Sequence, residues 1–205
     1  MAEFDEKAAT WDDDPVRVQR AAEIAGFLAN RIDLTKITSA LEYGSGTGLL
    51  SFALKDKLKN VVLMDESAEM TKVARNKCKT LQVAHFKPVQ YDLNKQPLPA
   101  DRYGLIYSLL TLHHIADTGA ILAKFYQLLN PGGYLAIIDL DQEDGSFHEG
   151  AFHGHHGFDR QELENKIIAA GLQPVSYAIC YELTRETDSG LKKFPLFLQI
   201  AQRPA

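Results

Sequence analysis

The feature that most limits the fold of this chain is a regular alternation of short apolar runs with amphipathic segments. The apolar runs, each short enough for one buried strand, lie at residues 37–43, 60–65, 85–93, 103–110 and 133–140. Segments of helical periodicity precede or separate them, at residues 14–32, 48–58, 67–78 and 116–129. Pro88 favours an edge position for its strand. This alternation predicts βαβ units and a parallel sheet with helices on both faces.

The pattern changes after residue 158. A helix is predicted over 160–170, because Asp159 and Glu162 resemble a capping box just before it. The segments 174–183 and 192–201 then alternate as strands do, with a short, non-helical connection between them. They predict an antiparallel hairpin. We therefore expect an α/β fold, a doubly wound, mostly parallel sheet of about seven strands whose last strand runs antiparallel.

Composition excludes several classes of protein. The chain has 205 residues and a net charge of −5, so the basic stripe of a nucleic-acid-binding surface is not expected. Cys78 and Cys180 are isolated, which favours a reducing compartment. The first residues are acidic and lack the apolar core of a signal peptide, and no apolar run is long enough for a membrane span. We expect a cytoplasmic protein with no nucleic-acid or membrane partner.

The length fits a single domain, residues 1–205. Within it we expect four parts, listed here in chain order: an N-terminal helical cap (1–35), a cofactor-binding core (36–140), a lid loop (141–158) and a C-terminal helix with a strand hairpin (159–205).

The stretch LEYGSGTGLL, residues 41–50, places three glycines between the first strand and its helix. Such a turn is a nucleotide-cofactor site in α/β folds. A dinucleotide loop requires G-x-G-x-x-G, but Leu49 occupies the position of the third glycine. Glu42, two residues before the first glycine, would repel a pyrophosphate and attract a cationic ligand. A bare structural turn is the alternative.

Several motifs resemble those of the class I S-adenosylmethionine-dependent methyltransferases, small-molecule branch. LEYGSGTG resembles the first motif, (D/E)-x-G-x-G-x-G; VVLMDESAEM resembles the second and YDLNKQPLP the third. YGLIYSLLTLHHI and LLNPGGYLAI resemble the segments of the fourth and fifth strands. The resemblance covers most of the chain and implies a Rossmann-like methyltransferase fold with S-adenosyl-L-methionine as cofactor.

The resemblance also implies roles for individual residues. Asp65 would hold the ribose hydroxyls and Asp92 the adenine amino group, although either acid alone is also explained as a helix cap or a turn residue. The glycines would let the backbone lie against the ligand. The complete set of cofactor-binding candidates is Glu42, Gly44, Ser45, Gly46, Gly48, Asp65, Glu66, Asp92, Leu93, Leu109 and Trp11. Trp11 or Phe4 could face the sulfonium cation, and packing of Trp11 on the first helix is an equal alternative.

The implied reaction is in-line transfer of a methyl group to a small-molecule acceptor, for which alignment matters more than acid–base chemistry. The fourth strand ends in SLLTLHHI and not in an N-P-P-Y motif, which disfavours nucleobase substrates. The rivals are a non-catalytic S-adenosylmethionine-binding domain, a nicotinamide oxidoreductase and a metal-binding protein.

Histidines supply the catalytic candidates, His113, His114 and His148, because imidazole titrates near neutrality. A structural role for one of the first two is the main alternative. Residues 139–156 are rich in potential metal ligands: Asp139, Asp141, Glu143, Asp144, His148, His153, His155 and His156. Their spacing matches no closed tetrahedral pattern, so we expect a polar lid over the acceptor and no metal. A simple solvated loop is the alternative.

Overall fold

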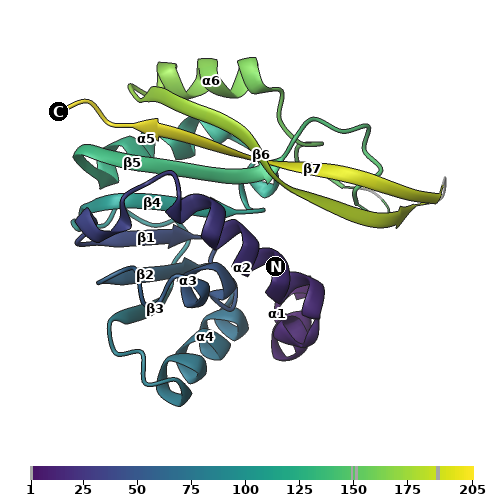
Figure 1. Ribbon diagram of the computed structural model, residues 1–205, viewed down its shortest axis with the longest axis horizontal. Helices are drawn as coiled ribbons and strands as arrows, with labels where there is room; N and C mark the ends of the chain where they lie inside the picture. Colours follow the sequence, from purple (N-terminus) through teal and green to yellow (C-terminus); the bar gives the residue numbers. More distant parts are fainter. Residues whose placement is uncertain (1, 149, 151, 188–189) are drawn as a thin grey trace. The chain divides into compact units, whose positions relative to one another are not determined.

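Seven strands follow the order β3-β2-β1-β4-β5-β7-β6 in the sheet of the computed structural model (Figure 1). The structure describes residues 2–148, 150, 152–187 and 190–205. β1 pairs parallel with β2 and β4, and β2 pairs parallel with β3. β7 pairs antiparallel with both β5 and β6. The predicted fold class, including the reversed last strand, is confirmed.

The chain forms two compact units, Met1–Tyr107 and Ser108–Ala205. The expected division of a single domain into cap, core, lid and hairpin stays a prediction. The helices of the first unit are α1 (Ala2–Lys7), η1 (Ala8–Asp13), α2 (Pro15–Ala29), η2 (Leu34–Lys36), α3 (Leu49–Ala53) and α4 (Ala68–Thr80). Its strands are β1 (Ala40–Tyr43), β2 (Val61–Asp65), β3 (Phe86–Gln90) and β4 (Tyr103–Leu109), which runs into the second unit.

Local sequence explains where these elements begin. The Asp14 side chain accepts a hydrogen bond from the backbone N–H of Val16, and Pro15 occupies the first turn of α2. Ser67 caps α4 by accepting from Met70. Every residue of β1 is buried, as expected for a central strand. α3 is shorter than the periodicity of residues 48–58 predicts, since it ends at Ala53.

The second unit contains η3 (Leu112–His114), α5 (Thr118–Leu128), β5 (Leu129–Leu140), α6 (Arg160–Ala169), β6 (Gln173–Thr187) and β7 (Gly190–Gln202). Asp159 caps α6 by accepting from Glu162, as the capping-box pattern predicts. β5 begins at Leu129, four residues before the predicted strand.

The strands β6 and β7 are longer than the sequence suggests. Residues Leu196–Gln202 of β7 pair with Tyr134–Leu140 of β5, whereas the earlier part of β7 continues along β6. Figure 1 shows this hairpin extending beyond the end of β5. β6 has two register shifts, between Pro174 and Ser176 and between Ile179 and Tyr181.

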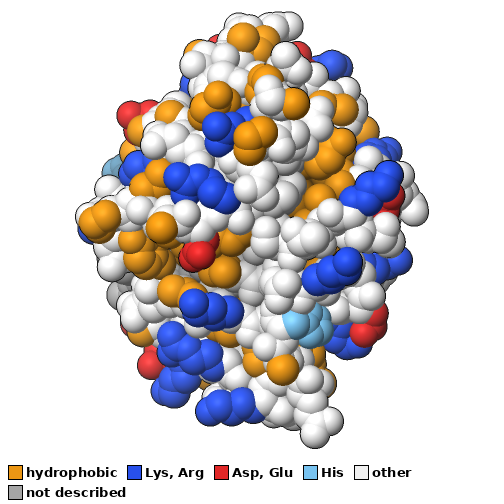
Figure 2. Space-filling model, turned by 90° about the vertical axis from the view of Figure 1, so that its left-hand side faces the viewer, with side chains coloured by type: hydrophobic (Ala, Val, Ile, Leu, Met, Phe, Trp, Pro, Cys, Tyr) orange, Lys and Arg blue, Asp and Glu red, His pale blue; other side chains and the backbone are white. Residues whose placement is uncertain are grey.

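The surface carries charges of both signs. On the face shown in Figure 2, Lys and Arg side chains are spread out, with apolar and uncharged side chains between them. Among the described residues, a helix with the length and apolarity needed to cross a bilayer is absent.

Candidate functional site

The glycine loop follows β1 in the first unit and depends on backbone conformations that favour glycine. Gly44, Gly46 and Gly48 have φ angles of +66°, +54° and +82°. A Cβ atom on Gly48 would lie 3.1 Å from the side chain of Leu63. The backbone N–H of Ser45 donates to the Met64 carbonyl at 3.0 Å, which ties the loop to β2. The loop therefore presents bare backbone beside the carboxyl end of β2.

Asp65, the last residue of β2, is bound to this loop. Its Oδ2 accepts a hydrogen bond from the N–H of Gly46 at 2.7 Å, and its Oδ1 accepts from the N–H of Ser67 at 2.9 Å. Burial raises the pKa of Asp65, and these two hydrogen bonds act against that rise. One carboxylate thus joins the glycine loop to the start of α4, with lone pairs left for further donors.

Glu66 and Asp92, two more of the predicted acids, line one hollow of about 390 Å³. The hollow is bounded by Glu66, Gln90, Tyr91, Asp92, Lys95 and Gln96. Lys95 forms an ion pair with Asp92 at 2.8 Å. Burial acts to raise the pKa of Asp92, but hydrogen bonds from Lys95 and from the backbone of Asn94 lower it below the usual value. Leu93, also a candidate, is fully buried.

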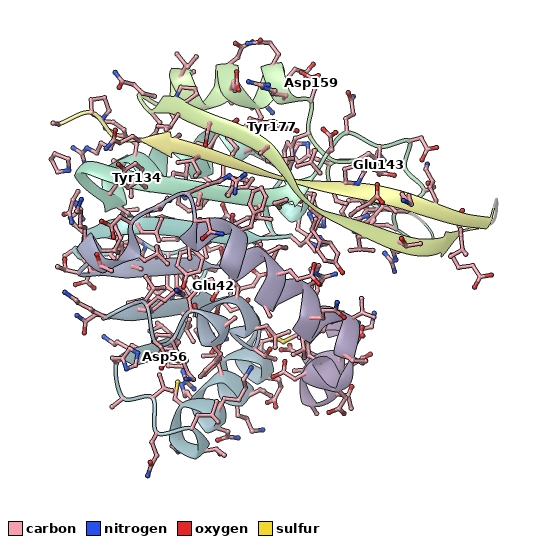
Figure 3. All side chains as sticks on the ribbon, viewed as in Figure 1. Glu42, Asp56, Tyr134, Glu143, Asp159 and Tyr177 are labelled. Atoms are coloured by element: carbon pink, nitrogen blue, oxygen red, sulfur yellow. The ribbon has the colours of Figure 1, made fainter. Side chains whose placement is uncertain are left out.

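Glu42 has a different environment from the one that the sequence suggests. Glu42, labelled in Figure 3, is 2% exposed. The Ser51 hydroxyl donates a hydrogen bond to its carboxyl group. The Ser51 hydroxyl also shares a hydrogen bond with the Tyr107 hydroxyl. Burial raises the pKa of Glu42 to about 8. Burial thus opposes the ionised carboxylate that the sequence suggests, and a contact between Glu42 and the cofactor stays a prediction.

The N-terminal segment is tied to the same loop. The carboxylate of Asp12 accepts a hydrogen bond from the Thr47 hydroxyl and forms an ion pair with Lys77 at 2.6 Å. Asp5 accepts from the hydroxyl of Ser67. Trp11 packs edge-on against Phe4 at 6.0 Å between ring centroids, and the Arg17 guanidinium lies 4.1 Å over its ring. A cation of the protein thus already occupies a Trp11 face, and contact with a sulfonium stays a prediction.

The second unit holds the remaining candidates. Leu109 ends β4, and Leu110 after it has a φ of +52°, a strained conformation for a non-glycine residue. In η3, His113 is buried and His114 is exposed. The ring Nδ1 of His113 lies 2.6 Å from Oδ1 of Asp139. This contact supports a structural role for the Nδ1 atom of His113, which is the main alternative to a catalytic role.

The loop at residues 141–158 is fixed at both ends within the second unit. The N–H of Phe158 donates to the Leu140 carbonyl at 3.0 Å, and the N–H of Glu143 donates to the His156 carbonyl at 3.0 Å. The N–H of His155 donates to the His113 carbonyl at 2.7 Å. The predicted lid is thus a closed loop held against η3, with Glu143 labelled in Figure 3. A role as a lid stays a prediction.

Sequence reasoning missed several residues that shape these sites. Ser51 and Tyr107 hold Glu42, and Asp12 holds the glycine loop. For Ser51 and Tyr107, the sequence offered one signal, a polar side chain within an otherwise apolar run. Asp12 lies in an acidic run where no single carboxylate stands out.

Comparisons with known proteins agree with this geometry. Residues 41–137 match the family model described as a methyltransferase domain. Malonyl-[acyl-carrier protein] O-methyltransferase of Laribacter hongkongensis is 27% identical, over 83% of this chain and 62% of its own length. A ubiquinone/menaquinone biosynthesis C-methyltransferase of Psychromonas ingrahamii is 29% identical, over 55% of this chain and 47% of its own length. The chain thus spans less than two thirds of these relatives.

Solved structures show the same fold. A SAM-dependent methyltransferase from Aquifex aeolicus superposes with a TM-score of 0.73, covering 97% of this chain and 98% of that one at 20% identity.

Proposed function

We propose that the chain is a class I S-adenosylmethionine-dependent methyltransferase that transfers a methyl group to a small-molecule acceptor by in-line displacement. S-adenosylmethionine is the cofactor. The donor methyl group is already activated by the sulfonium, so the protein has to align the acceptor and exclude water.

The first unit fits this cofactor. Adenosine offers two ribose hydroxyls and an amino group as donors and carries no phosphate. The first unit offers hydrogen-bond acceptors for these groups: Asp65 lies beside the glycine loop, and Glu66 and Asp92 line one hollow. The positive φ of Gly46, with no atom closer than 3.9 Å to an added Cβ, leaves room for a ligand to approach the loop backbone.

One observation carries the proposal: Asp65 joins the glycine loop to α4 through Gly46 and Ser67. This places a carboxylate at the end of β2 with its orientation fixed by two backbone donors. In the proposed complex it accepts the ribose hydroxyls with its remaining lone pairs. Gly44, Ser45, Gly48, Leu93 and Leu109 remain proposed contacts of the cofactor.

The class of acceptor is supported by relatives. They are named for O-methylation of malonyl-[acyl-carrier protein] and for C-methylation in ubiquinone/menaquinone biosynthesis.

A base is needed only for an acceptor that is protonated at the working pH. His113, His114 and His148 stay the candidates for that role. The proposal includes a cytoplasmic location, which suits Cys78 and Cys180, since neither forms a disulfide with a described residue.

The test follows labelled methyl groups. The protein is incubated with methyl-labelled S-adenosylmethionine and, separately, with the small-molecule, protein and nucleic-acid fractions of a cell extract. We expect label to enter a small molecule, and to be lost when Asp65→Asn replaces the wild type. Label entering only protein or nucleic acid would contradict the proposed acceptor class. Tight cofactor binding without turnover in any fraction would favour the non-catalytic alternative.

A further inference from the structure

Three histidines from two separate segments meet in the second unit. His113 and His114 lie in η3, directly after β4, and His148 lies in the loop at 141–158. One ring nitrogen of each lies within 4.8 Å of the others. Ring centroids of His113 and His148 are 5.2 Å apart, and those of His113 and His114 are 4.1 Å apart.

The ring of His113 is oriented by Asp139 of β5. The two side chains are 2% and 0% exposed, and the ring Nδ1 lies 2.6 Å from Oδ1 of Asp139. The same carboxylate accepts from the N–H of Leu140 at 2.8 Å and from the N–H of His113 at 3.3 Å. Because Nδ1 faces Asp139, Nε2 is the ring nitrogen of His113 that can face another partner. A carboxylate behind a histidine is the usual support of a metal-binding imidazole.

His148 brings a nitrogen atom without a partner. Its Nδ1 is buried and makes no hydrogen bond to any residue that the structure describes. The ring stacks on Phe152 with centroids 3.5 Å apart and an interplanar angle of 6°, which fixes its plane. A buried polar atom without a hydrogen bond is costly and calls for an explanation such as a bound ion.

The loop that carries His148 is held against η3. Beyond the bond from His155 to the His113 carbonyl, the Arg185 guanidinium donates to the Phe147 carbonyl at 2.6 Å. An added Cβ on Gly154 would lie 2.2 Å from the His113 carbonyl oxygen, so the backbones touch there. The approach of His148 to His113 is therefore built into the contacts on both sides of it.

We propose that His113, His114 and His148 bind a divalent first-row transition metal, zinc in the first place, with one coordination position left for water or another ligand. Imidazole nitrogens suit zinc, and three protein ligands with an open fourth position are a known arrangement for this ion. Tetrahedral zinc holds its ligand nitrogens about 3.3 Å apart. Since the described nitrogens lie within 4.8 Å of one another, they need to approach by at most about 1.5 Å. Histidines that hold zinc cannot also serve as the base of methyl transfer, so these two roles exclude one another, whereas the proposed binding of S-adenosylmethionine in the first unit does not depend on this site.

The sequence alone did not predict it. Only His148 of the three lies within residues 139–156, and the other two histidines come from η3, more than thirty residues earlier. The spacing of potential ligands within residues 139–156 therefore could not reveal the cluster.

The test is a zinc titration by calorimetry of protein that carries no histidine tag and has been stripped with chelator. We expect one zinc ion per chain. His114→Gln, an exposed position that spares the core, and His148→Gln should each weaken binding at least tenfold. Asp139→Asn leaves all three ligands in place and should weaken it by about 10- to 100-fold, as for other carboxylate partners of ligand histidines.

His153→Gln is the matched control, because His153 is an exposed histidine of the same loop and lies outside the cluster. It should bind zinc as the wild type does. Circular dichroism of each variant checks that the fold is kept. Absence of zinc binding in the wild type, or equal affinities in His114→Gln, His148→Gln and wild type, would overturn the proposal. S-adenosylmethionine binding measured on the same stripped protein tests the proposed function separately.

Discussion

The hydroxyl of Thr47 donates a hydrogen bond to the carboxylate of Asp12, which connects the N-terminal segment to the glycine loop thirty-five residues later. Lys77 of α4 completes the arrangement by pairing with Asp12 and donating to the Thr47 carbonyl at 3.0 Å. The N-terminal segment, the loop and α4 therefore restrain one another.

Asp12→Ala should loosen the glycine loop. A hydrogen bond to a charged group contributes about 1.5–3 kcal/mol, and partial exposure of the ion pair reduces its share, so we expect a loss of about 1–2 kcal/mol in the free energy of unfolding. Affinity for S-adenosylhomocysteine should also fall. Urea denaturation and calorimetry measure the two effects. Asp13→Ala, at the exposed neighbouring position, is the control and should change neither.

Asp65→Asn keeps the size of the side chain and removes its charge. We expect at least a tenfold loss of affinity for S-adenosylmethionine, about 1.4 kcal/mol, because charge-assisted hydrogen bonds to the ribose are lost. Asp65→Ala should in addition lower stability, since Gly46 and Ser67 lose their acceptor. Asp56→Asn, an exposed carboxylate labelled in Figure 3, controls for net charge. Unchanged affinity in Asp65→Asn would reduce Asp65 to a structural link.

Glu42 predicts a pH dependence of stability. Its pKa is about 8 in the folded protein, above its usual value near 4.5, because burial disfavours the charged form. Between these values the folded state binds more protons than the unfolded state, so the free energy of unfolding falls as pH rises, by about 1.4 kcal/mol per pH unit at most.

Glu42→Gln should remove this dependence, so its free energy of unfolding should increase relative to that of the wild type as pH rises from 5 to 8. Urea unfolding of both proteins at several pH values measures the difference. Glu6→Gln, at an exposed position of α1, should follow the wild type. Parallel curves for Glu42→Gln and wild type would mean that Glu42 is ionised in the folded state.

Alanine substitutions at two glycines should have opposite effects on stability. Gly154→Ala would place a Cβ 2.2 Å from the His113 carbonyl oxygen, so the loop must move and stability should fall by about 1–3 kcal/mol. Gly26 lies inside α2 with open space around its Cβ position, so Gly26→Ala should gain about 0.5–1 kcal/mol. Thermal and urea unfolding of both variants measure the effects. Equal stability of Gly154→Ala and wild type would mean that the loop is not held in the described position.

The sequence predicted the mostly parallel sheet with its reversed last strand, and the place of the glycine loop, because these follow from local signals. Alternating apolar runs indicated the parallel sheet, and Pro88 indicated the edge strand, which the structure confirms. The contacts of individual site residues could not be predicted, because they join residues that are far apart in the sequence. Burial beside Ser51 and Tyr107 raises the pKa of Glu42, and the ring of His113 is oriented by Asp139. Periodicity carries no information on such pairings, since they arise only when distant segments pack.

The two outer strands of the sheet share a feature that bears on its behaviour in a crowded cell. An open strand edge offers unpaired backbone groups to any other chain and invites aggregation. β3 contains Pro88 and β6 contains Pro174, and proline offers no N–H for such pairing. The two register shifts in β6 further bend its edge. These features make the outer edge of the hairpin, with exposed Val175 and Ile179, a poor template for strand pairing with another chain.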